Sequence, residues 1–129
     1  MAVTLDDYRT VSPPGSVDIL RRMAEKLRSR RVLRINANRT GTGVAEMLER
    51  HTPLLQELGV DARWEVMQGG EGFQATCDAL YNMLQGEEDR FSDEMLQQFI
   101  ATNRENAQRL SFDADVVVIH DHQPVPLID

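Results

Sequence analysis

The chain has 129 residues, of which 41% are hydrophobic and 27% charged, and its formal net charge is −7 at pH 7. This length predicts one domain that can bury a core, and no apolar run approaches the ~20 residues that a membrane-spanning helix needs. The acidic balance, without a basic stripe, argues against nucleic acid and membranes as partners.

The first fifteen residues contain SPPG and no periodicity, so we expect an N-terminal arm or surface loop over 1–15, without a secretory signal. Ser16 is a candidate N-cap for a helix over 17–29. Apolar residues recur in it at helical spacing: Ile19, Leu20, Met23 and Leu27. The basic run RRMAEKLRSRR is interpreted as the solvated face of this helix.

RVLRIN, residues 31–36, predicts the first strand, and a Gly/Thr turn then leads into a helix over 43–58. Pro53 lies inside that helical pattern, so we expect a kink or a split near His51. Gly59 is a natural C-terminal stop.

VDARWEVM predicts the second strand, and two helices follow it, over 72–84 and from a Ser92 cap to about Leu110. The inner side of the last helix is expected to carry Met95, Leu96, Phe99, Ile100 and Ala107. ADVVVIHD predicts the third strand, an apolar run typical of strands covered on both faces.

This order of strands and helices predicts an α/β fold with parallel βαβ units. Ligands of such folds bind at the carboxyl ends of the strands. Here those ends are Asn36, Gln68 and His120–Asp121, so we expect them to share one edge of the sheet.

NRTGTG, residues 38–43, satisfies the physical requirements of an anion site. Gly41 and Gly43 allow close approach of the backbone, Thr40 and Thr42 offer hydroxyls, and a helix N-terminus follows. The alternative is a tight joint between strand and helix, because neither the P-loop nor the Rossmann fingerprint is present.

HDHQP follows the third strand and places His120 and His122 on one side of the chain and Asp121 on the other. Two histidines could bind a metal, but no third ligand is evident, and we predict neither a metal nor a cofactor. An Asp–His pair could instead transfer protons. The remaining alternative is a polar strand end that Pro124 closes.

Two further residues and one short segment need an interpretation. Glu65, between Trp64 and Val66, needs either a partner or a place on an edge strand, and we favour the edge. The amide-rich TNREN, residues 102–106, is either solvated or turns Asn103 and Arg104 towards a cleft. Cys77 is most simply a small core hydrophobe, and a single cysteine suits a reducing cytoplasm, so we expect a cytoplasmic protein.

Four segments resemble the glycosyltransferring trehalose synthases, which are retaining nucleotide-sugar glycosyltransferases of the GT-B class. The segments are RRVLRINANRTGTGVAEMLERHTPLLQELGVDARWEVMQG, FQATCDALYNMLQG, TNRENAQRL and VVVIHDHQP. The likeness covers about residues 17 to 127. It implies a three-layer, Rossmann-like partial domain over 16–129, with a short parallel sheet of order 2-1-3 flanked by helices.

The resemblance also implies a function. In that family glucose passes from a nucleoside diphosphate glucose to glucose; the N-terminal domain supplies the acceptor side and a Gly-rich loop near the diphosphate. It assigns Gly41, Thr42 and Gly43 to that loop, and His120, Asp121 and Gln123 to the cleft-facing strand end. Trp64 and Glu65 match another family motif. No catalytic residue is assigned.

The sequence departs from the family at several positions. The family loop usually has three consecutive glycines, and here Thr42 takes the place of the middle one. His122 stands where the family has a proline, and Tyr81 where a histidine is common. The family's chain is several times longer and includes a donor-binding domain, so we expect this truncated domain to be inactive alone. A separate donor-domain chain would be a partner.

Strand order 2-1-3 implies an exposed edge at the third strand, which invites another chain. We therefore expect self-association, as a two-fold dimer that joins sheets or swaps elements. Two alternative functions stay open at this point: a non-catalytic homo-oligomeric or partner-binding module, and a small phosphate-binding α/β protein.

Overall fold

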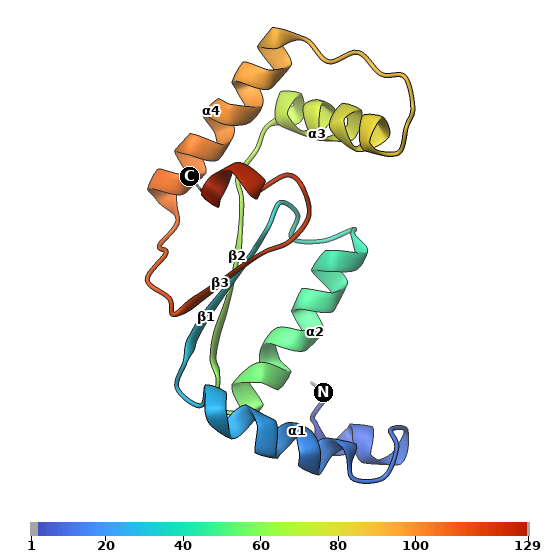
Figure 1. The fold of residues 1–129 in the computed structure, drawn as a ribbon, viewed down its shortest axis with the longest axis vertical. Coiled ribbons are helices and arrows are strands. Elements are labelled where there is room, and N and C mark those ends of the chain that lie inside the picture. The colour runs from blue at the N-terminus through green and yellow to red at the C-terminus, as the bar shows by residue number, and fades with distance from the viewer. Residues whose placement is uncertain (1–2, 129) are drawn as a thin grey trace. The chain divides into compact units, whose positions relative to one another are not determined.

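The computed structural model describes residues 3–128 (Figure 1). Its longer helices are α1 (Ser16–Ala24), α2 (Gly43–Glu57), α3 (Glu71–Leu84) and α4 (Asp93–Arg109). The strands are β1 (Arg31–Asn36), β2 (Asp61–Val66) and β3 (Val116–Ile119). Three short 3-10 helices cover Asp6–Thr10, Glu25–Leu27 and Val125–Ile128. The fold is α/β, as predicted.

The three strands form one parallel sheet in the order β2-β1-β3, which confirms the predicted order. Backbone hydrogen bonds fix the register. Asp61 N donates to Arg30 O and Met67 N to Asn36 O, so β2 keeps a constant offset from β1 as both run in the same direction. On the other side, Asp115 N donates to Arg31 O and His120 N to Ile35 O.

The chain forms two compact units, which we describe separately. Unit 1 contains residues 1–34, 40–64 and 112–118; unit 2 contains residues 35–39, 65–111 and 119–129.

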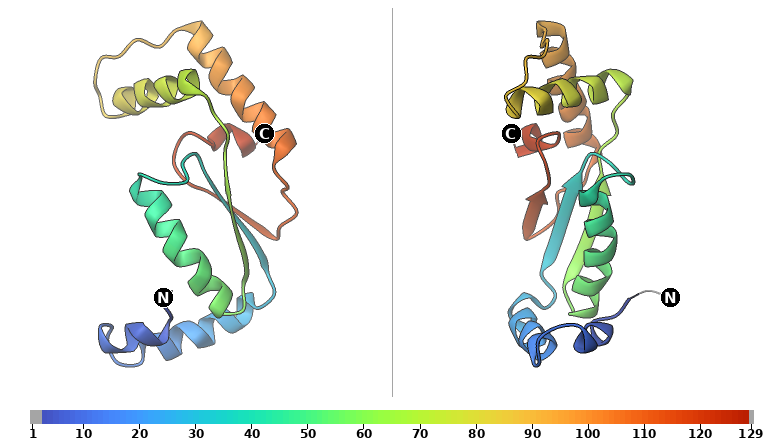
Figure 2. Two further views of the ribbon diagram at one scale, coloured as in Figure 1. Left: turned by 180° about the vertical axis from the view of Figure 1, so that it is seen from behind. Right: turned by 90° about the vertical axis from the view of Figure 1, so that its right-hand side faces the viewer.

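In unit 1, α2 lies alongside the strands, and Figure 2 shows it from two further directions. The buried hydrophobic side chains of this unit are small or aliphatic: Leu5, Val17, Ala24, Leu33, Ala45, Leu48, Val60 and Ala62. The N-terminal arm contributes Leu5 to this core, and Leu5 N donates to Glu57 Oε2 at 2.9 Å. This segment therefore packs against the core of unit 1, whereas its composition predicts only an arm or surface loop.

Helix α1 differs from the prediction in its cap and in its buried face. Gly15, with φ 83°, occupies the N-cap position, and Ser16 is the first helical residue. Val17 and Ala24 are the buried positions, whereas the predicted stripe is largely exposed: Ile19, Leu20, Met23 and Leu27. The small Ala24 permits close packing, and the larger apolar side chains are left outside.

Helix α2 is continuous across Pro53, so the expected split near His51 is wrong. Thr52 Oγ1 donates to Leu48 O at 2.8 Å inside this stretch. The predicted stop is confirmed, because Gly59 follows the helix with φ 83°.

In unit 2, α3 packs against α4 through Phe73 and Phe99, whose rings stack with centroids 5.7 Å apart. The Ser92 cap is confirmed, since its hydroxyl accepts from Met95 N at 3.2 Å. The inner face of α4 differs from the prediction: Phe99, Asn103 and Asn106 are buried, while Leu96 is 46% exposed. Two amides thus line the inner face together with Phe99, whereas Leu96 and Ala107, which were predicted to lie there, are exposed.

Strand β3 is an edge strand, and its apolar run is not covered on both faces. Val116 and Val117 are 44% and 39% exposed. The edge that the resemblance implied is therefore present. Within residues 3–128 no helix is both long and apolar enough to cross a bilayer.

Candidate functional site

The ends of the three strands meet within unit 2. Met67 N donates to Asn36 O, and His120 N donates to Ile35 O, each at 2.9 Å. Asn36 is only 2% exposed, and its Nδ2 donates to Asn38 O at 2.7 Å. The predicted convergence of the strand ends is thus observed.

After β3 the chain turns sharply at Asp121, whose φ of 67° lies in the left-handed region. Non-glycine residues rarely adopt this conformation, and such strain concentrates at functional sites. The turn directs His122 onto α3: His122 Nε2 lies 3.1 Å from Cys77 O, and its ring centroid lies 6.0 Å from that of Tyr81. His122 therefore helps to attach the strand end to α3.

Gln123 and Asn103 form the centre of the candidate site. Asn103 Nδ2 donates to Phe99 O at 3.0 Å and to Gln123 O at 3.1 Å. Because both neighbours are carbonyl oxygens, the NH₂ group must face them, which fixes the orientation of the amide. Its other atom, Oδ1, is buried and has no hydrogen-bond partner among the described residues, and the same is true of Gln123 Oε1.

Asn106, one turn further along α4, is the residue that sequence reasoning missed. Its Oδ1 accepts from Gln68 N and its Nδ2 donates to Gln68 O, both at 2.8 Å. A further hydrogen bond runs from Nδ2 to Thr102 O at 2.8 Å. The spacing of two amides three residues apart was the available signal, because such residues share a helix face. Arg104, by contrast, is exposed.

Cys77 behaves as predicted, with 1% of its surface exposed. Burial, assisted by the nearby Asp78 carboxylate, raises the pKa of the Cys77 thiol to about 12. The thiol is therefore a core group and a poor nucleophile.

The glycine turn belongs to unit 1. Gly41 has φ 78°, which favours glycine, whereas a Cβ added at Gly43 would meet none of the described residues. Thr42 is the N-cap of α2, and its hydroxyl accepts from Ala45 N at 3.2 Å. Since this hydroxyl already caps the helix, Thr42 has a structural role that its pattern alone did not reveal.

The predicted site residues divide between the two units. His120, Asp121, Gln123 and Glu65 belong to unit 2; Gly41, Thr42, Gly43 and Trp64 belong to unit 1. Glu65 lies on β2 at one edge of the sheet, which is the position we favoured for it. Among residues 3–128, no three His, Cys, Asp or Glu side chains group as metal ligands would.

Comparison with known proteins points to one family. A family model described as trehalose synthase, N-terminal domain, matches residues 34–129. Trehalose synthases of Thermococcus litoralis and Pyrococcus furiosus are each 35% identical over 97% of this chain and 31% of their own length. The trehalose synthase of Rubrobacter xylanophilus is 36% identical over 93% of this chain and 30% of its own.

The chain thus spans about a third of the length of these relatives. The family match nevertheless includes the strand ends, the glycine turn and both buried amides of α4. The chain belongs to the family of trehalose synthase N-terminal domains.

Proposed function

We propose that unit 2 binds a glucose-like hexose as the acceptor side of a trehalose-forming glycosyltransferase. The family supports this proposal, because its relatives are named trehalose synthases. The binding residues would be His120, Asp121 and Gln123 at the strand end, with Asn103 beneath them and Glu65 contributing from β2.

One observation carries the proposal: the two buried acceptor oxygens without partners, Asn103 Oδ1 and Gln123 Oε1. A buried polar atom without a hydrogen bond costs about 1–3 kcal/mol, so it needs a donor that the described residues do not supply. Sugar hydroxyls are such donors. Asn103 Nδ2 also donates to the backbone O of Gln123, which holds the Asn103 side chain against that residue. We propose that one hexose donates to both oxygens.

For the donor we propose a nucleoside diphosphate glucose whose diphosphate contacts the turn Gly41-Thr42-Gly43. Gly41 provides the left-handed backbone, and the space beside Gly43 leaves the first amides of α2 accessible. Trp64 is a further donor-side candidate in unit 1. This arrangement corresponds to the GT-B class.

The transfer reaction itself is proposed for the whole enzyme. The relatives are proteins of which this chain covers 31%, and no residue here is assigned to catalysis. We therefore propose that residues 1–129 alone bind sugar without transferring it, and that other residues, on the same or a separate chain, complete the donor site to which the glycine turn contributes. The single buried Cys77 supports a cytoplasmic location.

The exposed edge of β3 favours a second candidate, a non-catalytic partner-binding module. Val116 and Val117 present an apolar edge that another strand could extend. A small phosphate-binding protein is the third candidate, and only the glycine turn supports it.

Calorimetric titration separates these candidates. Glucose, trehalose, a nucleoside diphosphate glucose and inorganic phosphate would each be titrated into the chain. Saturable heat with glucose supports the hexose site. No heat with any of the four ligands supports the partner-binding module. Heat with phosphate but not with sugar supports the small phosphate-binding protein.

A separate variant tests whether the glycine turn binds the nucleotide sugar. Gly43→Val is suitable because a Cβ added there meets open space among the described residues. We expect Gly43→Val to fold normally and to lose binding of the nucleotide sugar, while glucose still binds in unit 2. Unchanged binding of the nucleotide sugar would exclude the turn as its site.

A further inference from the structure

Helix α1 presents an apolar ridge that nothing in unit 1 covers. Ile19, Met23 and Leu27 follow one another at intervals of four residues and are 49%, 64% and 46% exposed. We call these three residues the α1 ridge. Ile19 and Met23 lie one turn apart on α1, and Leu27 lies in the 3-10 helix Glu25–Leu27 that follows directly, so the ridge continues from α1 into this turn.

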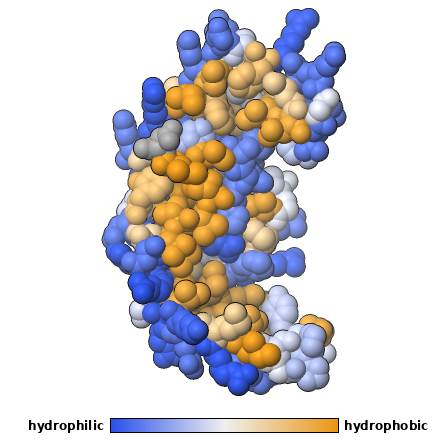
Figure 3. All heavy atoms as spheres, viewed as in Figure 1, coloured by the Kyte–Doolittle hydropathy of each residue, from blue (hydrophilic) through white to orange (hydrophobic). Residues whose placement is uncertain are grey.

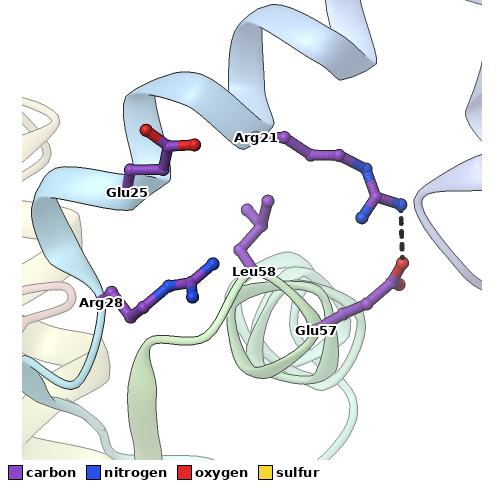
Figure 4. Close-up of a pocket in the computed structure, with 5 residues that line it drawn as sticks. All are labelled: Arg21, Glu25, Arg28, Glu57 and Leu58. Atoms are coloured by element: carbon purple, nitrogen blue, oxygen red, sulfur yellow. Dashed lines mark hydrogen bonds and ion pairs between the residues drawn. The ribbon is translucent and has the colours of Figure 1, made fainter.

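The opposite side of α1 is held in place, which fixes the direction of the ridge. Val17 and Ala24 are buried, and Arg21 Nη2 pairs with Glu57 Oε1 at 3.4 Å. Figure 4 shows this pair at a cavity of about 240 Å³, where Arg21 and Arg28 face the end of α2. Turning the ridge inward would break this packing, so its exposure is a property of the fold.

Charge is divided unequally between the two units. Unit 1 contains ten Asp and Glu residues and ten Lys and Arg residues, whereas unit 2 contains eleven acidic residues and four arginines. The whole net charge of −7 therefore belongs to unit 2. Beside the α1 ridge, Arg22 and Lys26 are exposed, so the ridge has a basic flank.

Unit 2 has a surface of the complementary kind where α3 ends and α4 begins. Its exposed apolar residues are Tyr81, Leu84 and Leu96, at 53%, 64% and 46%. Exposed carboxylates follow in the connecting loop: Glu87, Glu88 and Asp89. We call these six residues the α3–α4 patch. Figure 3 shows apolar residues over α3 and α4 and over α1, and a broad apolar area over β3.

We infer that a second copy of this chain docks its α3–α4 patch onto the α1 ridge. Exposed charge lies beside the apolar side chains on both surfaces. Arg22 and Lys26 flank the ridge, where the nearby Asp18 is paired with Arg9, and the loop carries three carboxylates against one arginine, Arg90. The prevailing signs are opposite. Complementary charge selects this partner and guides its approach, while the apolar residues supply the burial. The exposed edge of β3 is the surface where the strand order predicts self-association, whereas charge complementarity favours α1 and unit 2.

The contact joins two different surfaces, so it is heterologous. Two copies that make it reciprocally form a closed dimer, and copies that make it once each form a ring or a chain. In every case Lys26 of one copy lies near the acidic loop of the next. Self-association must therefore weaken when salt screens these charges.

Sedimentation velocity over a range of chain concentrations tests the inference. We expect self-association that weakens between about 0.05 M and about 0.5 M NaCl. Lys26→Glu and Glu88→Lys should each lower the association constant about tenfold, because each places like charges across the contact. Far-UV circular dichroism checks that both variants fold.

Matched controls carry the same change of net charge elsewhere on the surface. Arg50→Glu on α2 and Glu105→Lys on α4 alter exposed residues outside the ridge and the patch, and should change the association constant by less than about twofold. A chain that stays monomeric throughout overturns the inference. So does self-association that Lys26→Glu leaves intact and Val117→Lys abolishes, which would place the contact at β3.

Discussion

The side-chain amide of Asn106 is hydrogen-bonded to both backbone groups of Gln68, with Gln68 N donating to Oδ1 and Nδ2 donating to Gln68 O, each at 2.8 Å. This pair mimics the pairing of two strands and ties α4 to the segment that follows β2. A buried helix residue thus positions the strand end on which the candidate sugar site depends.

Asn106→Ala should therefore destabilise the chain by about 2 kcal/mol, because the Gln68 and Thr102 backbone groups lose their partner. Denaturant unfolding measures the change. The control is Gln108→Ala on the exposed side of α4, which should change the free energy of unfolding by less than about 0.5 kcal/mol. Equal effects of the two substitutions would show that water replaces the Asn106 amide without cost.

Gln123→Met should separate stability from binding. Methionine keeps the shape of the side chain and removes a buried oxygen that has no protein partner among the described residues. We expect the free energy of unfolding to stay the same or to rise by about 1 kcal/mol. Glucose binding should weaken about fivefold, the equivalent of one lost hydrogen bond.

Calorimetry and denaturant unfolding together check the Gln123 prediction, and Gln108→Met serves as the control for the chemical change. A less stable chain with unaltered glucose binding would contradict it, since Gln123 Oε1 would then be satisfied within the protein.

The ends of the helices in unit 2 could be predicted from a few adjacent residues. Ser92 caps α4 as predicted, and α3 ends at Leu84, where the sequence predicts its end. These features depend on a few adjacent residues, so the sequence predicts them well. The parallel direction of the strands likewise follows from the alternation of strands and helices, whereas their order 2-1-3 is what the family resemblance implied.

The faces of α1 and α4 could not be predicted in this way. Periodicity identifies an apolar stripe, but it does not say which side of the helix another element covers. On α4 the buried positions include Asn103 and Asn106, because backbone carbonyls of the neighbouring segments are available to their amides. On α1 the small Ala24 is buried while Met23 is exposed. Both outcomes depend on tertiary contacts between distant segments.

The role of Thr42 gives a third prediction. Its hydroxyl caps α2 by accepting from Ala45 N, so Thr42→Ala should cost about 1 kcal/mol of unfolding free energy. Thr42→Ser keeps the hydroxyl and should cost much less. Thr42→Gly should cost only a few tenths of a kcal/mol and creates the three consecutive glycines that the family resemblance implies.

Thermal and denaturant unfolding of the three Thr42 variants give the comparison. If Thr42→Ser is as destabilising as Thr42→Ala, the hydroxyl does not stabilise the helix. Calorimetry with a nucleoside diphosphate glucose adds a functional readout: Thr42→Gly should bind it at least as tightly as the unchanged chain, because a Cβ is removed from the turn.

Acid should destabilise unit 1 through the pairing of Arg31 with Asp115. Arg31 N donates to Asp115 Oδ2 at 2.9 Å and Nη2 to Oδ1 at 3.0 Å, which lowers the pKa of Asp115 from 3.8 to about 2. A carboxylate with a lowered folded-state pKa stabilises the fold fully above 3.8 and loses that contribution as the pH falls through about 2. The melting temperature should therefore fall less between pH 5 and pH 2 in Asp115→Asn than in the unchanged chain.

Asp61→Asn, at the exposed start of β2, is the control. Its melting temperature should fall between pH 5 and pH 2 by as much as that of the unchanged chain. Identical acid profiles for the unchanged chain and Asp115→Asn would mean that this pair persists in the unfolded state or contributes nothing to stability.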